Sequence, residues 1–170
     1  NLLTFNRFGT LPTRNFQQGT FEEAPNLSPE QLRVEYSRTR ASCVACTIGC
    51  EHIYSVGGSQ VRIEYENLFA LGSLCGVSDH GAVLRASQRC DELGIDTISA
   101  GGTIAFAMEC VEQGWLDAPW LTFGSGDAML RAIELIGARE GLGELLAQGS
   151  RRAAAVIGHD SLAIAPQVKG

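Results

Sequence analysis

The sequence lacks any run of lysine or arginine longer than two residues. Thirteen basic side chains stand against nineteen acidic ones, which gives a formal net charge of −6 at pH 7. A surface that follows nucleic-acid phosphates needs an excess of positive charge. We therefore expect no nucleic-acid partner for this chain.

Long apolar runs are absent as well, and no stretch approaches the roughly 20 residues that a membrane span requires. The N-terminus lacks the basic, apolar and small-residue progression of a signal peptide. These absences favour a cytoplasmic protein that makes no contact with a membrane. The chain opens on Asn1 rather than methionine, and we interpret it as a segment of a longer protein.

Phosphate-binding glycine patterns of the G-x-G-x-x-G and G-x-x-x-x-G-K-S/T types do not occur. A nucleotide cradle therefore has no support in the sequence. The glycines of the second half interrupt or join predicted helices, and we interpret them as sites of close helix contact: Gly101, Gly102, Gly137, Gly143 and Gly149.

Six cysteines are present, and they are unevenly distributed. Three form a C-x2-C-x3-C cluster, which favours metal or redox chemistry in a reducing compartment over a disulfide framework. The other three stand alone in apolar surroundings, where cysteine usually acts as a small hydrophobic residue. The clustered set is Cys43, Cys46 and Cys50, and the isolated set is Cys75, Cys90 and Cys110.

Two kinds of metal centre remain open for the clustered cysteines. A structural zinc ion needs four ligands in a closed tetrahedron, and His52 is the histidine nearest to the cluster. An iron–sulfur cubane also takes four thiolates, but the fourth can come from a remote segment. Three clustered cysteines without a local fourth donor therefore favour the iron–sulfur centre over zinc.

The periodicity predicts a mostly α, multihelical domain with a small β-hairpin near the cysteine loop. A capping box at Ser28 predicts a helix within 26–40, and β-branched residues around Gly57 and Gly58 predict a hairpin over 52–64. Apolar residues at helical spacing predict four further helices. They are expected over 79–93, through Ile104, Met108 and Val111 with an end at Gly114, around 129–136, and over 142–156 with closure at Gly158.

Five stretches, taken in order, resemble the tungsten-dependent aldehyde ferredoxin oxidoreductase family. They are residues 9–24 (GTLPTRNFQQGTFEEA), the cysteine cluster, 64–67 (EYEN), 91–110 (DELGIDTISAGGTIAFAMEC) and 140–154 (EGLGELLAQGSRRAA). The similarity covers nearly the whole chain. It implies that residues 1–170 form the helical region that follows the N-terminal pterin-binding β domain of such an enzyme, with a further C-terminal part beyond.

The resemblance implies an enzyme that oxidises aldehydes or related oxo compounds to acids. Tungsten, or in some members molybdenum, is held by two pyranopterins, and electrons leave through a 4Fe-4S cluster to ferredoxin or a similar acceptor. Three cluster ligands then correspond to Cys43, Cys46 and Cys50, and the fourth belongs to the family's C-terminal part. The isolated segment is expected to be inactive. The alternative is a non-catalytic iron–sulfur electron-transfer module or a structural zinc-binding module.

The resemblance also assigns residues to the pterin and to catalysis. Asp91, Gly94, Ile95 and Asp96 match the family's D-x-x-G-L/I-D pterin motif, in which the carboxylates can accept hydrogen bonds from ring and amino groups. Taken alone, Asp96 is also a typical N-cap of the next helix. Glu66 matches a glutamate near the metal, where it is a candidate for proton exchange, although it could also be a solvated carboxylate at a helix start.

One departure from the family concerns the dimer. Some members hold an iron ion at a dimer interface through E-x-x-H motifs, whereas no glutamate of this chain is followed three residues later by a histidine. The bridging iron is therefore not expected here, and a homodimer stays an open possibility.

Overall fold

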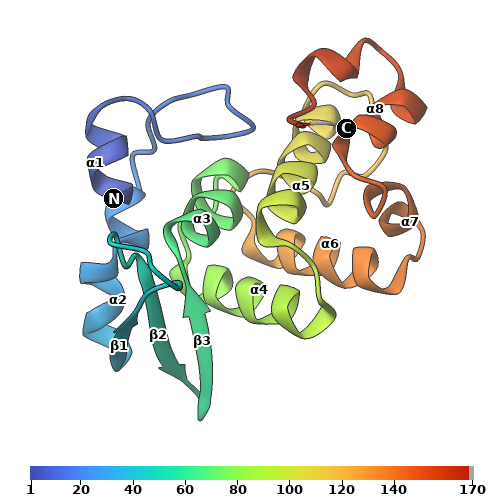
Figure 1. Cartoon of the computed structure of the whole chain (residues 1–170). Coiled ribbons are helices and arrows are strands. Elements are labelled where there is room, and N and C mark those ends of the chain that lie inside the picture. The colour runs from blue at the N-terminus through green and yellow to red at the C-terminus, as the bar shows by residue number, and fades with distance from the viewer. Residues whose placement is uncertain (169–170) are drawn as a thin grey trace.

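The computed structural model describes residues 1–168. A small antiparallel sheet and two N-terminal helices lie on one side of the molecule, and the longer helices lie on the other (Figure 1). The predicted mostly α fold with a hairpin beside the cysteine loop is confirmed. Lys169 and Gly170, the last two residues of the predicted domain, lie outside the described residues.

The first half of the chain is built from short elements. They are α1 (Leu2–Arg7), the 3-10 turn η1 (Ala24–Leu27), α2 (Pro29–Glu35), β1 (Arg38–Ala41), β2 (Glu51–Val56), β3 (Ser59–Ile63), α3 (Tyr65–Asn67), the π-helical turn η2 (Leu68–Gly72) and the 3-10 turn η3 (Ser73–Cys75). The cysteine loop, residues 42–50, connects β1 to β2.

The predicted start of α2 is confirmed, but its predicted end near Arg40 is wrong. Ser28 Oγ accepts a hydrogen bond from the Gln31 amide at 3.2 Å, which satisfies one of the free N–H groups of the first turn. The helix ends at Glu35, and Tyr36 is already extended, with φ −126° and ψ 137°. Residues 38–41 then pair with β2. Backbone pairing with β2, the next strand in the chain, therefore overrides the local tendency of residues 38–41 to form a helix.

The sheet has three strands in the order β1-β2-β3, so the predicted hairpin forms two of them. β2 and β3 pair through the register Tyr54 with Val61, and both side chains are 1% exposed. On its other edge, β2 pairs with β1 through the register Arg40 with His52. The two ends of the cysteine loop are thereby held side by side in neighbouring strands.

Helices dominate the second half. They are α4 (His80–Leu93), α5 (Thr97–Glu112), α6 (Gly126–Ala138), α7 (Leu142–Leu146), α8 (Ser150–Ile157) and the 3-10 turn η4 (Ser161–Ile164). The predicted limits of α4 are confirmed, because Asp79 is its N-cap and Gly94 follows it with φ +68°. α5 likewise ends just before Gly114, as predicted. No helix in this part of the chain, or elsewhere in residues 1–168, is long and apolar enough to cross a membrane.

The single helix predicted over 142–156 is wrong, since the structure divides it into α7 and α8. Gly149 has φ +86° and ψ 163°, a conformation far from helical that glycine adopts readily. Its amide donates to Leu146 C=O at 3.0 Å and closes the turn after α7. The apolar spacing continues across this break, which is why the period alone did not reveal it.

The hydrophobic core centres on α5, whose residues 100–110 are all buried. The isolated cysteines Cys75, Cys90 and Cys110 are each 0% exposed, which confirms the prediction that they fill the core. Burial raises the pKa of each of these thiols to about 12. They stay protonated at neutral pH and behave as small apolar groups.

A close contact between α5 and η2 explains one of the predicted glycine positions. A Cβ atom added to Gly101 would lie 2.3 Å from the carbonyl oxygen of Ala70, whereas the nearest atom to one added at Gly102 is Pro166 Cγ at 3.6 Å. We expect Gly101→Ala to lower the free energy of unfolding by about 1–3 kcal/mol, because backbone must move to make room. Gly102→Ala should be neutral or stabilising, since alanine favours a helix. Urea denaturation of both variants tests this, and equal midpoints would contradict the close contact.

Candidate functional site

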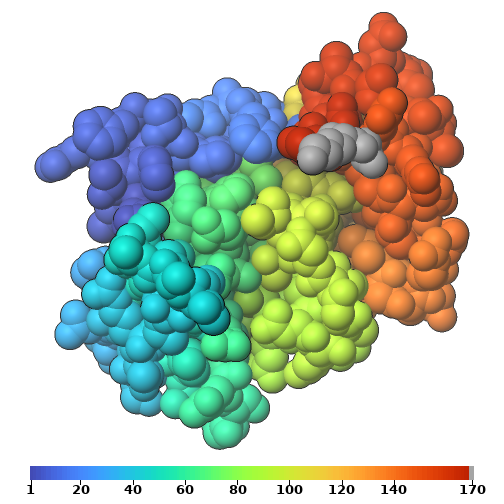
Figure 2. Space-filling model, in the orientation of Figure 1, coloured from blue at the N-terminus to red at the C-terminus, as the bar shows by residue number. Residues whose placement is uncertain are grey.

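The cysteine loop lies at the surface of the molecule, where its cyan atoms are visible in Figure 2. Its three thiols are free; Cys43 is exposed, and Cys46 and Cys50 are partly buried. Within residues 42–50, one backbone hydrogen bond closes a turn, from the Cys46 amide to Cys43 C=O at 3.0 Å. Ala45 and Gly49 have positive φ, +59° and +57°. The loop therefore has little regular structure of its own.

The structure places all three predicted ligands on one loop but does not arrange them as a metal-binding group. Among residues 1–168 no group of three His, Cys, Asp or Glu side chains is arranged to hold a metal ion. Instead, the Cys43 thiol donates to Glu64 Oε1 at 3.5 Å, and this hydrogen bond and the Glu64 charge raise its pKa. Three free thiols still supply a donor set suited to an iron–sulfur cluster. The assignment of Cys43, Cys46 and Cys50 as ligands stays a prediction.

His52, the nearby candidate for a zinc ligand, is engaged with the loop backbone. Its Nδ1 lies 2.8 Å from the Cys50 carbonyl oxygen. Burial lowers the pKa of His52, and the charges of Arg38 and Arg40 lower it further. The hydrogen bond to Cys50 opposes this lowering of the pKa. Because a carbonyl oxygen only accepts, Nδ1 of His52 carries the hydrogen and donates this bond.

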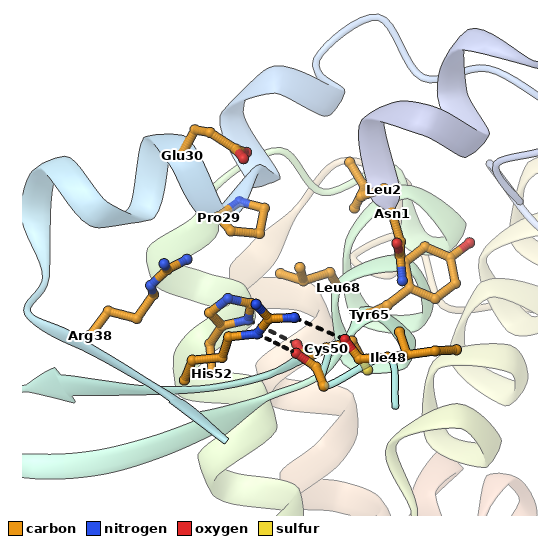
Figure 3. A pocket seen from close by; sticks show the side chains of 12 residues that line it. Asn1, Leu2, Pro29, Glu30, Arg38, Ile48, Cys50, His52, Tyr65 and Leu68 are labelled. Atoms are coloured by element: carbon orange, nitrogen blue, oxygen red, sulfur yellow. Dashed lines mark hydrogen bonds between the residues drawn. The ribbon is translucent and has the colours of Figure 1, made fainter. Parts of the chain in front are cut away.

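Two cavities are lined in part by the loop. One, of about 240 Å³, contains Cys50 and is lined from α1, α2, β1 and the loop (Figure 3). The other, of about 470 Å³, contains Cys43. Its other lining residues are Ser42, Val44, Glu51, Arg62, Glu64, Asn67 and Asp91.

The larger cavity joins two motifs that are far apart in the sequence. Cys43 belongs to the cysteine cluster, and Asp91 opens the predicted pterin motif. Two further lining residues, the buried Glu51 and Arg62, form an ion pair at 2.5 Å. The structure therefore brings a predicted cluster ligand and a predicted pterin ligand to the same cavity.

The D-x-x-G-I-D stretch forms the junction between α4 and α5. Gly94 takes a left-handed conformation, and its amide and the Ile95 amide bond back to Asp91 C=O and Cys90 C=O at 3.2 and 2.8 Å. This pattern is a Schellman stop. Asp96 Oδ2 then accepts from the Ser99 amide at 2.7 Å, so the N-cap interpretation of Asp96 is confirmed. Asp91, in contrast, lines the larger cavity.

Glu66 lies in α3, immediately before the π-helical turn η2. Its Oε2 atom is buried and has no hydrogen-bond partner among the described residues. Burial and the charge of Glu66 raise the pKa of the neighbouring Tyr65. A buried carboxylate oxygen without a partner is costly, and such atoms occur at functional sites. The alternative of a solvated carboxylate at a helix start does not fit this oxygen.

Asn67 is a site residue that the sequence analysis did not single out. Its Oδ1 accepts from the Glu64 amide at 2.7 Å, and its Nδ2 donates to Thr97 Oγ1 at 3.0 Å and Ser87 Oγ at 3.3 Å. These bonds tie α3 to both α4 and α5 and thereby position Glu66 next to it. The signal was its place in the EYEN stretch, but its two partners on remote helices, Ser87 and Thr97, are invisible in a sequence.

Fold and site together define a mostly helical domain in which a three-cysteine loop adjoins a carboxylate-lined cavity. The chain belongs to the aldehyde ferredoxin oxidoreductase family, because residues 1–170 match the family model described as aldehyde ferredoxin oxidoreductase, domains 2 and 3. The resemblance carried by the motifs is thereby confirmed.

Individual relatives support this membership. The chain is 41% identical over 162 residues to a tungsten-containing aldehyde ferredoxin oxidoreductase of Thermococcus kodakarensis, with 91% of this chain and 27% of the relative covered. It is 39% identical over 167 residues to the protein of the same description from Pyrococcus furiosus, covering 94% and 28%. The chain thus spans about a quarter of the length of these relatives.

A solved structure shares the fold. It is described as the active site complex BamBC of benzoyl coenzyme A reductase in complex with 1,5-dienoyl-CoA. The TM-score is 0.71 at 25% identity, and the match covers 92% of this chain and 25% of that chain. The helical arrangement described above is therefore found in a further redox enzyme complex.

Proposed function

We propose that residues 1–170 form part of an oxidoreductase that converts aldehydes or related oxo compounds to acids. The observation that carries the proposal is the cavity of about 470 Å³ shared by Cys43 and Asp91. It places a candidate ligand of an electron-transfer cluster beside a candidate ligand of a pterin cofactor. The tungsten-containing relatives support the same chemistry.

The cysteine loop would hold a 4Fe-4S cluster through Cys43, Cys46 and Cys50. Such a cluster takes four thiolates. The remaining cysteines are fully buried in the core and carry raised pKa values. We propose that the fourth thiolate comes from protein outside residues 1–170, and that electrons pass to ferredoxin or a similar carrier.

The α4–α5 junction would hold a pyranopterin that carries tungsten or molybdenum. When bound, this cofactor supplies the metal centre at which the carbonyl compound is oxidised. The Asp91 carboxylate would accept hydrogen bonds from N–H groups of the pterin ring. Gly94 and Ile95 form a close backbone turn that would lie beside the ring, and Asp96 fixes this turn to the start of α5.

Glu66 would serve as the proton acceptor of the reaction. Conversion of an aldehyde to a carboxylic acid consumes water and releases electrons and protons in pairs. Because the electrons would leave through the cluster, a protein group would be needed to accept the protons. The buried Glu66 Oε2, which has no partner among residues 1–168, is available for this role.

The experiment that tests the proposal uses the complete gene product that contains residues 1–170, purified anaerobically. We expect iron, acid-labile sulfide, pterin and tungsten or molybdenum in the protein, and aldehyde-dependent reduction of a viologen dye. Iron and sulfide without pterin would favour an electron-transfer module. A colourless protein that holds zinc alone would overturn the proposal in favour of a structural module.

Asp91→Ala tests the pterin assignment. We expect this variant to contain less pterin and less tungsten or molybdenum, because ring donors would lose their acceptor at a cost of about 1–3 kcal/mol. The matched control is Glu92→Ala, since Glu92 is the adjacent carboxylate and pairs with Arg89 at the surface. Pterin content that is equal in both variants and the parent protein would show that the motif serves only as a helix junction.

A further inference from the structure

The cysteine loop depends on side chains from the strands for its shape. Three consecutive carbonyl groups, those of residues 48, 49 and 50, each accept a hydrogen bond from such a side chain. Arg40 supplies two of these bonds, from Nε to Gly49 C=O and from Nη2 to Ile48 C=O, both at 2.9 Å. His52, its partner in the strand register, supplies the third. Figure 3 shows these bonds beside Ile48 and Cys50.

The contact between Arg40 and the loop is also a packing contact. Gly49 has φ +57°, and a Cβ atom added there would lie 3.5 Å from Arg40 Nη2 and 3.4 Å from Ser42 Cβ. Between residues 42 and 50 the backbone makes a single hydrogen bond of its own, near Cys43 and Cys46. The Cys50 end of the loop is therefore held chiefly by the guanidinium fork of Arg40 and by His52.

We propose that Arg40 is a positioning residue for the metal centre, which fixes the backbone that presents Cys50 as a ligand. This inference rests on the proposed function, because it takes Cys50 as a cluster ligand. Groups that orient metal ligands through hydrogen bonds are nearly as important as the ligands, and their loss typically lowers metal affinity about 10- to 100-fold. The planar fork of arginine suits two adjacent carbonyl groups, whereas the single ammonium of lysine does not.

The test compares variants at Arg40 and Arg38 in the complete gene product. Arg38 and Arg40 both lie on β1 and both line the cavity of about 240 Å³. Arg38→Met therefore removes an equal charge without removing the hydrogen bonds to the loop. For Arg40→Met we expect the concentration of ferrous-iron chelator that removes half of the iron to fall about 10-fold or more. We also expect an altered electron paramagnetic resonance signal of the reduced cluster. Arg40→Lys should lie between Arg40→Met and the parent protein.

The outcomes separate this inference from the proposed function. Equal chelator midpoints and unchanged resonance signals in Arg40→Met, Arg40→Lys and Arg38→Met would overturn the positioning role, and so would an equal loss in the Arg40 and Arg38 variants. If Arg40→Met does not fold, the comparison of Arg40→Lys with Arg38→Met decides the same question. Cys50→Ser, measured in parallel, reports on the cluster itself. Should it keep the parent signal, the proposed function fails at Cys50 whatever the arginine variants show.

Discussion

Replacing Cys50 with serine is expected to abolish or strongly alter the iron–sulfur cluster of the complete gene product. A serine hydroxyl is a poor ligand for iron compared with a thiolate, and it stays protonated at neutral pH. With the cluster lost, electrons released in the proposed reaction would have no exit, and aldehyde-dependent dye reduction should stop. The measurement is the electron paramagnetic resonance signal of the reduced protein, together with iron and sulfide content.

Cys90 provides the control for this experiment. It is 0% exposed on α4, and burial raises the pKa of its thiol to about 12. Cys90→Ala should leave the cluster signal intact and cost on the order of 1 kcal/mol of stability through lost packing. An intact signal in Cys50→Ser combined with a lost signal in Cys90→Ala would reverse the ligand assignment.

Replacing Glu66 with glutamine should lower kcat by about 10²- to 10⁴-fold, the usual contribution of a general acid or base. Glutamine keeps the size of the side chain but cannot take up the proton at the position of Oε2. Because Glu66 is not a proposed ligand of the cluster or the pterin, metal and pterin contents should equal those of the parent protein. Steady-state dye reduction at saturating aldehyde, with metal analysis of the same samples, checks both expectations.

Glu140→Gln is the matched control, because Glu140 is an exposed carboxylate distant in sequence from the site. This variant should retain the parent kcat. Should Glu66→Gln also retain it, the buried Oε2 atom would have a structural role only. A parallel loss of pterin in Glu66→Gln would instead assign Glu66 to cofactor binding.

The sequence by itself determined the features that depend on local chemistry. Helix α4 was predictable at both ends because Asp79 and Gly94 are the residue types that start and stop helices. The hairpin followed from two β-branched segments around a pair of glycines. The separation of clustered from isolated cysteines followed from spacing, and the motifs in order indicated the family. Apart from the order of the motifs along the chain, each of these signals is complete within a few neighbouring residues.

The tertiary structure decided what depends on residues far apart in the chain. Residues 38–41, predicted as the end of a helix, form β1 because their backbone pairs with β2. The last predicted helix is divided at Gly149, whose non-helical backbone conformation cannot be detected from the spacing of apolar residues. The cavity shared by Cys43 and Asp91 and the hydrogen bonds of Arg40 to the cysteine loop likewise arise from folding. So does the burial of Glu66 Oε2, which has no partner among residues 1–168. Hydrogen bonds and burial join atoms in space, so these relations arise only when the remote segments have packed together.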